Sequence, residues 1–344
     1  MKGIRKLRLF TFVIMFSLVV CTLQAVLASN VVVHAGEKGE SSLNDEVVLA
    51  YYDVKTGKET LYRASDFEKM RGVRVNNVVY PKSATNEIVE KKLSTSEIEN
   101  LNKAQTKDNF EMETISTRTV DNRMLVSNPQ ADPYYKIAKL YFNQAYNSLG
   151  ETGNYMGTGF AVGNRLCATA RHCLTDNYGN WSTNFTAYYG YNGNNNTYNN
   201  KLTNVSGYIY YPQYITGKNA DGTIITDPDY DIAFVIWDQR TVEMTGCFGM
   251  NSALNNNMAL RTAGYPGDLN SGLRMYESYG NLTGSTDLRM FCNNIYCMGG
   301  QSGSPYFDAD QFVYGVITHT AEGASSGRRL DSAVIQWIID NKYD

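Results

Sequence analysis

The chain has 344 residues, a hydrophobic fraction of 43% and a formal net charge of −3 at pH 7. A chain of this length can hold two domains of ordinary size, or one larger domain together with segments that are removed. A net charge so close to zero supplies no basic field for nucleic acid, and we expect no nucleic-acid partner. The 26 tyrosines, among many Asn, Gly, Ser and Thr residues, favour a β-rich protein that faces water.

The first segment has the pattern of a secretion signal. Basic residues between Lys2 and Arg8 precede an apolar run over 9–27, and small residues at Ala28 and Ala35 each mark a cleavage site. A membrane anchor is the alternative, because the run is nearly long enough to span a bilayer. We predict a signal peptide over 1–35, cut near 28 or 35, and a secreted, extracellular product without membrane contact after cleavage.

Six cysteines occur, and Cys21 falls within the signal. The odd number that remains means that at least one is free or pairs between molecules. Cys167 with Cys173, and Cys292 with Cys297, are close enough in sequence for local disulfides, although spacing alone does not establish a bridge. No CxxC motif or His/Cys cluster indicates zinc, and we expect no metal.

Residues 36–115 are richer in charged residues than the sequence that follows. The runs 47–52 and 59–62 flank a short turn and predict a hairpin, and Ser94 with Glu97 predicts the capping box of a helix. The segment carries no catalytic pattern and is long enough for only a small core. We interpret it as a propeptide that is removed to activate the remainder. A small accessory domain that stays attached is the alternative.

The remaining sequence consists of short apolar runs between turns rich in Gly, Asn and Asp. This density of strand-like runs, with little helical periodicity, predicts a β-barrel or a sandwich. The run 136–142 is ambiguous between a strand and a short helix, whereas 159–170 predicts a hairpin with its turn at Gly163-Asn164. Further strands are predicted over 205–211, 232–237, 259–264 and 312–318.

The end of the chain predicts a helix. Asp331 and Ser332 can cap it, and Val334, Trp337 and Ile338 would share one face. We expect this helix to dock on the β-structure.

A serine among glycines, in the stretch 298–305, has the setting of an acyl-transfer nucleophile. Glycines let the backbone turn sharply and bring two N–H groups to one reacting atom. Ser302 would attack, and the N–H groups of Gly300 and Ser302 would receive the oxyanion. Such a stretch is a common flexible loop unless a base and an acid accompany it.

A base and an acid do stand upstream. Of the three histidines, His34 falls in the signal, and His172 ends an apolar strand, where a general base can be held rigidly. Asp231 directly precedes an apolar strand, so its carboxylate can be buried, fix the tautomer of His172 and stabilise the imidazolium. The order of His172, Asp231 and Ser302 is that of the chymotrypsin-type triad. Three nearby aspartates read as solvated turn residues, with a calcium site as the alternative: Asp227, Asp229 and Asp238.

The motifs around these residues resemble those of the trypsin-like serine proteases. Thr169-Ala170-Arg171-His172-Cys173 is similar to their histidine motif, Tyr230-Asp231-Ile232-Ala233 to their aspartate motif, and 299–305 to their serine motif. The form Gly-Gln-Ser-Gly-Ser-Pro, with 157–160 and 264–268, resembles the bacterial glutamyl endopeptidase (V8-like) branch. The resemblance covers 116–344. It implies an all-β, chymotrypsin-like double β-barrel with a C-terminal helix, and a monomeric serine endopeptidase that cleaves proteins or peptides without a cofactor.

The resemblance also implies a specificity pocket. His319 and Thr320 stand where the family places the groups that bind an acidic P1 side chain. Cys297 stands where the family has Thr or Ser on the pocket wall, and a thiol is a poorer donor. One extra residue also precedes His319. We expect a preference for glutamate at P1, with a non-acidic preference as the alternative.

In this family the new N-terminus made by propeptide removal can take part in substrate binding. The register with Asp121 predicts that terminus between Glu113 and Val120, and a cut after Glu113 would be self-processing. The competing class of function is a protease-fold binding or toxin-like protein with little turnover.

Overall fold

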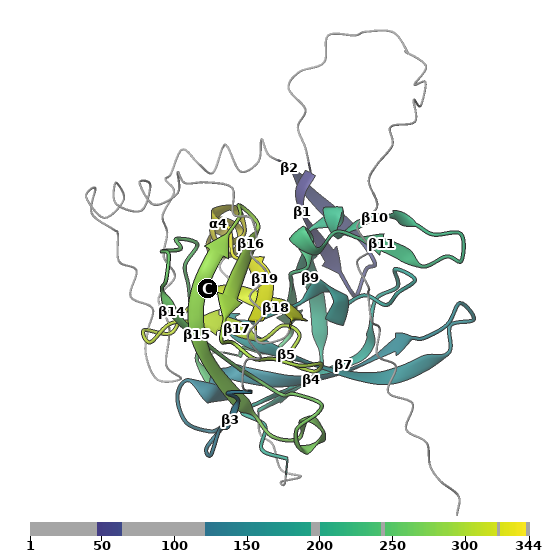
Figure 1. Cartoon of the computed structure of the whole chain (residues 1–344). Coiled ribbons are helices and arrows are strands. Elements are labelled where there is room, and N and C mark those ends of the chain that lie inside the picture. Colours follow the sequence, from purple (N-terminus) through teal and green to yellow (C-terminus); the bar gives the residue numbers. More distant parts are fainter. Residues whose placement is uncertain (1–46, 64–120, 194–199, 242–244, 322–323, 342–344) are drawn as a thin grey trace, which may run out of the picture. The chain divides into compact units, whose positions relative to one another are not determined.

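Figure 1 shows the computed structural model of the chain. It describes residues 47–63, 121–193, 200–241, 245–321 and 324–341. The predicted signal peptide, the helix expected after Ser94 and the expected cleavage window at 113–120 lie outside the described residues. All described elements belong to one compact unit, Asp45–Asp344. Within them, no helix has both the length and the apolarity needed to cross a membrane.

The C-terminal half of the described chain forms a closed β-barrel, named the second barrel below because it follows the other sheet in the chain. Strand β18 pairs with β17, and the pairing continues through β14, β15, β16 and β19 back to β18. These strands are β14 (Ala259–Gly264), β15 (Tyr276–Ser285), β16 (Arg289–Asn293), β17 (Pro305–Phe307), β18 (Phe312–Ala321) and β19 (Ala324–Arg329). Two short strands pair onto it from outside, β3 (Met124–Leu125) on β15 and β13 (Gly249–Met250) on β18. The ring leaves no free edge along its strands.

The other half is a nine-stranded sheet in the order β2-β1-β9-β12-β6-β5-β4-β7-β8. Its strands are β1 (Val47–Asp53), β2 (Glu59–Arg63), β4 (Ile137–Ala145), β5 (Thr152–Gly163), β6 (Leu166–Thr169), β7 (Thr183–Tyr189), β8 (Lys201–Leu202), β9 (Val205–Tyr210) and β12 (Ala233–Trp237). A separate ribbon consists of β10 (Ile215–Lys218) and β11 (Ile224–Thr226). The predicted all-β, barrel-containing fold is confirmed, although the described pairings leave this first sheet open, with β2 and β8 at its ends.

The predicted strands form close to the expected residues. The ambiguous run 136–142 is strand β4, because it pairs with β5 on one side and β7 on the other. The hairpin predicted over 159–170 is β5–β6. The run predicted over 312–318 extends as β18 to Ala321. The segment interpreted as a propeptide also contributes its predicted hairpin, β1–β2, with Gly57 in the left-handed region at φ 67°.

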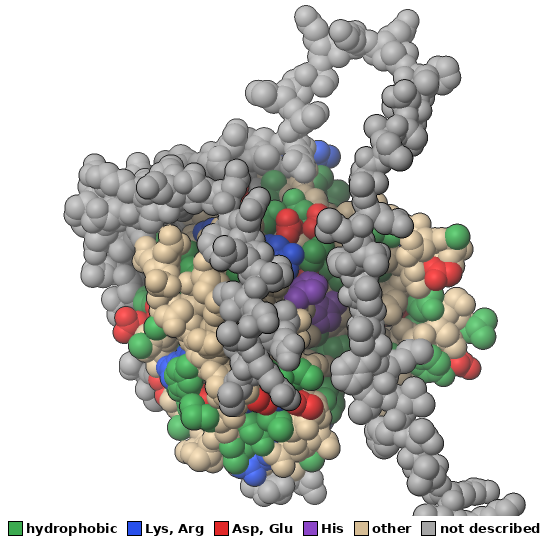
Figure 2. Space-filling view, viewed as in Figure 1, with side chains coloured by type: hydrophobic (Ala, Val, Ile, Leu, Met, Phe, Trp, Pro, Cys, Tyr) green, Lys and Arg blue, Asp and Glu red, His purple; other side chains and the backbone are tan. Residues whose placement is uncertain are grey.

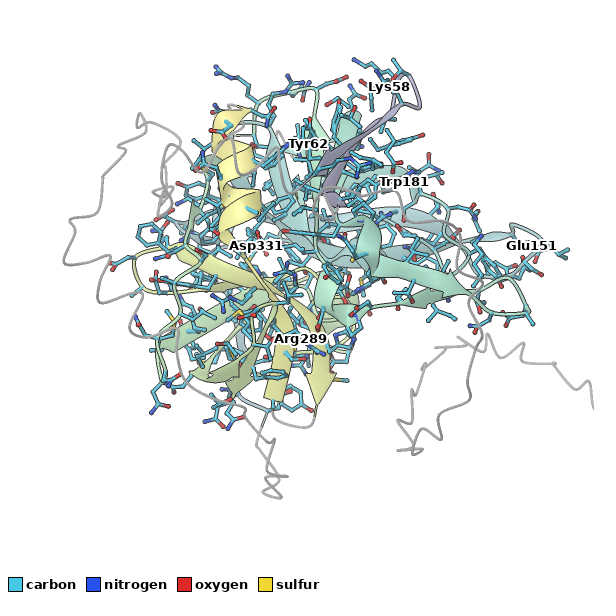
Figure 3. The ribbon with its side chains drawn as sticks, turned by 90° about the horizontal axis from the view of Figure 1, so that it is seen from above. Lys58, Tyr62, Glu151, Trp181, Arg289 and Asp331 are labelled. Atoms are coloured by element: carbon cyan, nitrogen blue, oxygen red, sulfur yellow. The ribbon has the colours of Figure 1, made fainter. Side chains whose placement is uncertain are left out.

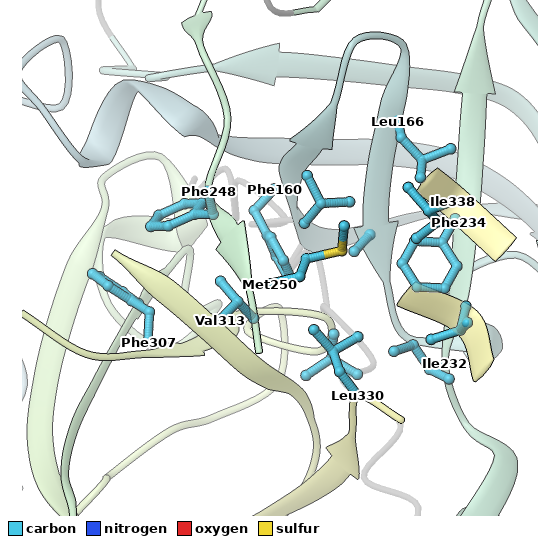
Figure 4. Packing of buried hydrophobic residues seen from close by; sticks show 14 of the residues in the cluster. Phe160, Leu166, Ile232, Phe234, Phe248, Met250, Phe307, Val313, Leu330 and Ile338 are labelled. Carbon is cyan, nitrogen blue, oxygen red and sulfur yellow. The ribbon is translucent and has the colours of Figure 1, made fainter. Parts of the chain in front are cut away.

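A hydrophobic core joins the two halves (Figure 4). Phe248 contacts Phe160 of the first sheet at 5.9 Å and Phe307 of the second barrel at 5.0 Å between ring centroids. Each such side chain stabilises the fold by roughly 1.5–3 kcal/mol through burial. The core therefore fixes the two halves against each other, and residues at their facing ends can share a site.

The C-terminal helix α4 (Ser332–Asp340) packs into the same core, as expected from its apolar face. The Asp331 carboxylate caps it by accepting a hydrogen bond from the N–H of Val334 at 2.9 Å. Trp337 and Ile338 are 1% and 0% exposed, so the helix closes one side of the core.

The five cysteines among the described residues are all buried and free. The two local disulfides considered from the sequence are therefore not formed. Cys167 and Cys173 lie in the core of the first sheet, and Cys292 and Cys297 in the core of the second barrel. Here the thiols act as small apolar side chains.

Candidate active site

His172 and Asp231 meet because their strands are neighbours. Strands β6 and β12 are antiparallel, with Thr169 opposite Ala233, so the end of one strand meets the start of the other. His172 follows in the 3-10 helix η2 (Arg171–Cys173), and Asp231 ends the 3-10 helix η4 (Pro228–Tyr230). The predicted base and acid are thus placed side by side by strand register.

The Asp231 carboxylate holds His172 at two atoms. Its Oδ2 accepts from the ring Nδ1 at 2.8 Å, and its Oδ1 accepts from the backbone N–H of His172 at 3.0 Å. An ionised carboxylate can only accept, so Nδ1 carries the hydrogen and Nε2 is the basic nitrogen. Asp231 is 3% exposed, whereas the imidazole is 36% exposed. Asp231 therefore fixes the orientation of the ring, and part of the ring remains accessible to solvent.

The pair shifts the pKa of both groups. Burial opposes ionisation of Asp231, yet the charge of His172 and the two hydrogen bonds from it hold the carboxyl pKa below its ordinary value. Burial likewise works against a charged His172, but the Asp231 charge raises the pKa of the imidazole well above its ordinary value. The histidine therefore binds a proton more readily than a free imidazole does.

Ser302 lies in a loop that is tied to both halves of the molecule. Its carbonyl accepts from the N–H of Thr158 on β5 at 2.9 Å, and the N–H of Gly303 donates to Ile317 on β18 at 2.8 Å. Gly303 has φ 85°, and a Cβ there would lie 2.2 Å from the Thr158 oxygen. Only glycine fits this position, so the loop can cross between the two sheets next to the serine.

Thr158 joins the histidine strand to the serine loop. Its carbonyl accepts from the Thr169 hydroxyl on β6 at 2.9 Å, and its own hydroxyl donates to Gly300 at 2.8 Å. The Cys173 sulfur, beside His172, lies 3.9 Å from the Ser302 carbonyl oxygen. These contacts bring the histidine and serine motifs together. Among the described residues no hydrogen bond joins the Ser302 hydroxyl to the His172 ring, and such bonds often tighten only around substrate.

The serine loop leaves the N–H groups of Gly300 and Ser302 available for an oxyanion. The N–H groups of Gln301, Gly303 and Ser304 donate to backbone carbonyls within the described structure. The N–H groups of Gly300 and Ser302 donate to no group in the described part of the chain. Gly300 has φ 95°, a conformation that glycine adopts at little cost. A site with two unpaired backbone donors beside a serine can stabilise a tetrahedral oxyanion.

His319 lies on β18 at the edge of this region and is exposed. The pairing of β18 with β19 shifts between Ile317 and His319, so a bulge at Thr318 absorbs one extra residue and sets His319 opposite Ser326. The Thr318 hydroxyl lies 2.7 Å from His319 Nδ1. Although part of the ring is exposed, desolvation by the surrounding groups lowers the pKa of His319 below its ordinary value, with Asp231 opposing and Arg289 adding to the shift. Figure 2 shows histidine side chains on this face, with positive and acidic side chains beside them.

The other two predicted pocket residues differ in access. Thr320 is exposed and lies opposite Ser325 on β19. Cys297 is 3% exposed and belongs to the core of the second barrel. Burial raises the pKa of its thiol to about 12, so it stays neutral. Cys297 can shape the base of a pocket but presents almost no surface to a substrate.

The sequence motifs did not point to Arg289, which begins β16. Its Nη2 donates to the Ser326 hydroxyl at 2.9 Å, and its Nε lies 3.8 Å from Asp229. Ser326 is also the cross-strand neighbour of His319. The positively charged Arg289 and His319 are therefore both next to Ser326. Only the pairing of β16 with β19 reveals this, because no local pattern distinguishes Arg289 from other strand arginines.

The aspartates considered for calcium have other contacts. Asp227 caps η4 by accepting from the N–H of Asp229 at 2.9 Å, Asp229 faces Arg289, and Asp238 pairs with Lys55. In the part of the chain that the structure describes, no group of three or more His, Cys, Asp or Glu side chains is arranged for a metal.

Comparison with known proteins finds a matching family model. Residues 157–316 match the family model of the trypsin-like peptidase domain. A glutamyl endopeptidase of Bacillus licheniformis is 26% identical over 193 residues, which are 55% of this chain and 53% of that protein. The chain thus spans about half the length of the curated relative it matches.

Solved structures of similar proteins include a Glu endopeptidase in complex with MPD. It is 21% identical, with a TM-score of 0.49, over 65% of this chain and 98% of that one. The protease Anisep from Arthrobacter nicotinovorans is 19% identical, with a TM-score of 0.49, over 64% and 100%. The matched region contains His172, Asp231 and Ser302, so the resemblance to trypsin-like serine peptidases that the three motifs predicted is confirmed over this part of the chain.

Proposed function

We propose that this protein is a secreted serine endopeptidase with His172, Asp231 and Ser302 as its catalytic residues. The observation that carries the proposal is the buried Asp231 carboxylate, which grips His172 at both its N–H and its Nδ1 beside the serine loop. This arrangement leaves Nε2 as the base. The sequence similarity to a glutamyl endopeptidase supports it.

The steps follow from the roles of these atoms. Ser302 Oγ attacks the scissile carbonyl carbon while its proton passes to His172 Nε2, and the N–H groups of Gly300 and Ser302 bind the oxyanion. The tetrahedral intermediate collapses, the C–N bond breaks, and the leaving amine takes the proton from His172. Water then attacks the acyl carbon while its proton passes to His172 Nε2. The bond between the acyl carbon and Ser302 Oγ breaks, His172 returns the proton to Oγ, and the acid product leaves. Asp231 stays ionised and stabilises the imidazolium.

The experiment that tests the proposal is covalent labelling of the purified, processed protein with a fluorophosphonate. This reagent reacts with an activated serine, so we expect one phosphonyl group per chain, on the peptide that contains Ser302, and no labelling after prior denaturation. A folded, processed protein that stays unlabelled would favour the competing function, a protease-fold binding or toxin-like protein with little turnover.

The proposal includes a preference for acidic P1 side chains. His319, whose pKa is lowered, is largely neutral at neutral pH and can donate one hydrogen bond but little charge. We assign the tautomer in which its Nδ1 accepts from Thr318, so Nε2 carries the hydrogen. Arg289 adds the permanent charge that a carboxylate needs, and a guanidinium matches carboxylate geometry. Thr320 supplies a hydroxyl, and Cys297 lines the buried base.

We expect Arg289→Gln to lower kcat/KM for a Glu P1 substrate about 10–100-fold, with little effect on the Gln P1 analogue. The reason is that a hydrogen bond to a charged group contributes about 1.5–3 kcal/mol. The Gln side chain of the analogue has the same shape as Glu but carries no charge, so it gains little from the arginine. The measurement uses peptides that differ only in Glu, Gln, Lys or Phe at P1.

Arg165→Gln is the matched control, because Arg165 lies just before β6, at the end away from His172. An unchanged Glu/Gln ratio in Arg289→Gln would remove Arg289 from the pocket. A wild-type enzyme that prefers Lys or Phe would establish the non-acidic alternative.

Secretion, activation by removal of an N-terminal segment and action as a monomer complete the proposal. Residues just after the expected cut are anchored near the serine loop. The Arg123 guanidinium binds Asp268 at 2.6 and 2.8 Å, and Gly267, beside it, donates to Gly299 at 2.7 Å. A cut at 113–120 would therefore release a chain end only a few residues from a segment that contacts the loop.

A further inference from the structure

The β1–β2 hairpin, from the segment interpreted as a propeptide, is built into the first sheet. Strand β1 pairs antiparallel with β9, with Ala50 opposite Tyr210 and Asp53 opposite Gly207 (Figure 1). The pairing satisfies backbone groups along one edge of β9, whose other edge is paired with β12. Strand β1 of the hairpin therefore supplies the second hydrogen-bonded neighbour of β9.

Side chains of β1 belong to the core. Leu49 is 1% exposed and joins the cluster that links the two halves, and Ala50 is 0% exposed and joins the cluster inside the first sheet. Strand β2 differs, since Leu61 is 44% exposed. Burial on this scale is typical of an integral strand and not of a segment that only rests on the surface.

The partner strand is shaped to receive β1. Gly207 lies inside β9, and a Cβ there would be 2.5 Å from the Tyr51 ring and 2.8 Å from the Tyr52 carbonyl oxygen. Glycine inside a strand weakens it and often marks the close approach of another backbone. Here that approaching backbone is the hairpin.

Aromatic contacts connect the hairpin to the residue next to the catalytic histidine. Tyr52 stacks on Trp181 at 5.1 Å, and Trp181 covers the Arg171 guanidinium at 4.1 Å. Tyr210, which bonds to Glu59 of β2, lies against the same guanidinium at 4.4 Å. Arg171 is 4% exposed and directly precedes His172. The hairpin thus backs both aromatic rings that hold this arginine.

A further contact reaches the C-terminal helix. Tyr62 of β2 meets Trp337 of α4 edge-on at 5.5 Å. Figure 3 labels Tyr62, which belongs to the hairpin, and Trp181. The hairpin contacts both the first sheet and the helix that closes the core, so its loss would uncover surface at two places.

We propose that the β1–β2 hairpin, residues 47–63, remains in the active protease as a strand of the first sheet. When the chain is cut at 113–120, the hairpin stays bound by its pairing with β9 and by its buried side chains. Release would expose apolar core surface and leave an unpaired strand edge, which is a site for aggregation. The protease is then a noncovalent two-piece molecule, and the interaction surface is the free edge of β9, which takes a strand by β-augmentation.

The first test examines the secreted, processed protein as it is purified. Native size-exclusion chromatography is followed by mass spectrometry under denaturing conditions. We expect an N-terminal fragment that contains 47–63 in equal amount to a chain that begins at 113–120. A fully active preparation that contains only the chain from 113–120 would overturn the proposal. Because mass is measured without substrate, this result is independent of whether the protein is a peptidase.

The second test uses one change on each strand of the hairpin in the full chain. Leu49→Ala removes a buried side chain, and Leu61→Ala makes the same change at an exposed position. Both variants are expressed as the full chain and measured after processing. We expect Leu49→Ala to lower the thermal midpoint by about 5 °C or more and to lose the fragment on chromatography, with Leu61→Ala like wild type. Equal midpoints and equal retention in both variants would contradict an integral β1 strand.

Discussion

Replacement of Ser302 by alanine is expected to lower kcat by about 10⁶-fold, the size of effect that removal of a triad nucleophile produces. The hydroxyl is the only group proposed to bond covalently to the substrate, so nothing else in the loop can replace it. The measurement is cleavage of a Glu P1 peptide at saturating substrate, with active sites counted by titration in the wild type.

Ser304→Ala is the matched control for this variant. Ser304 is fully buried in the same loop, and its hydroxyl has no hydrogen-bond partner in the described structure. We therefore expect nearly wild-type activity from this change. Comparable activity in wild type and Ser302→Ala would contradict the assigned nucleophile, and equal losses in the two variants would indicate damage to the loop.

Asp231→Asn is expected to lower kcat by about 10⁴-fold and to shift the pH profile. The amide keeps the shape but cannot hold His172 in the required tautomer or stabilise its positive charge. In the wild type the Asp231 charge raises the pKa of His172, and catalysis needs the neutral ring. Activity should therefore rise with pH through a pKa above the ordinary histidine value. Without the charge, burial lowers the pKa of His172, so the acidic limb should move to lower pH.

The measurement is kcat/KM against pH, which reports the free enzyme. Asp221→Asn makes the same change in the exposed turn between β10 and β11 and should leave both the rate and the profile unchanged. An acidic limb that stays in place in Asp231→Asn would separate the limb from His172 and contradict the assigned pairing.

The sequence indicated those residues of the candidate site whose pattern is recognisable from their immediate neighbours in the chain. His172 and Asp231 each stand at the end of a strand, and Ser302 stands among glycines that the turn requires, so residue type and position were informative together. The meeting of His172 and Asp231 depends on one strand register, that of β6 with β12. Two apolar strands with polar ends are consistent with that pairing. Arg289 carries no such signal, because its role arises from neighbours on β19.

The same limit applies to the fold. Two strand-like runs around a short turn predicted the hairpin of β1 and β2. Its partner strand β9 lies about 150 residues away in the chain, and no residue near the hairpin specifies that strand. The segment 136–142 was ambiguous because its apolar run suits both a helix and a strand, and pairing on both sides decided it. Cysteine spacing allowed two bridges that the folded chain does not form.

The division of the proposed catalytic residues between the two halves bears on when peptidase activity could arise during synthesis. His172 and Asp231 come from the first sheet, whereas Ser302 follows the strands of the second barrel and is held to the first by Thr158. A chain made from its N-terminus has its base and acid long before its nucleophile. Even a complete chain needs both halves docked before Thr158 can hold the serine loop. On the proposed mechanism, a nascent or partly folded molecule would therefore have no complete catalytic site.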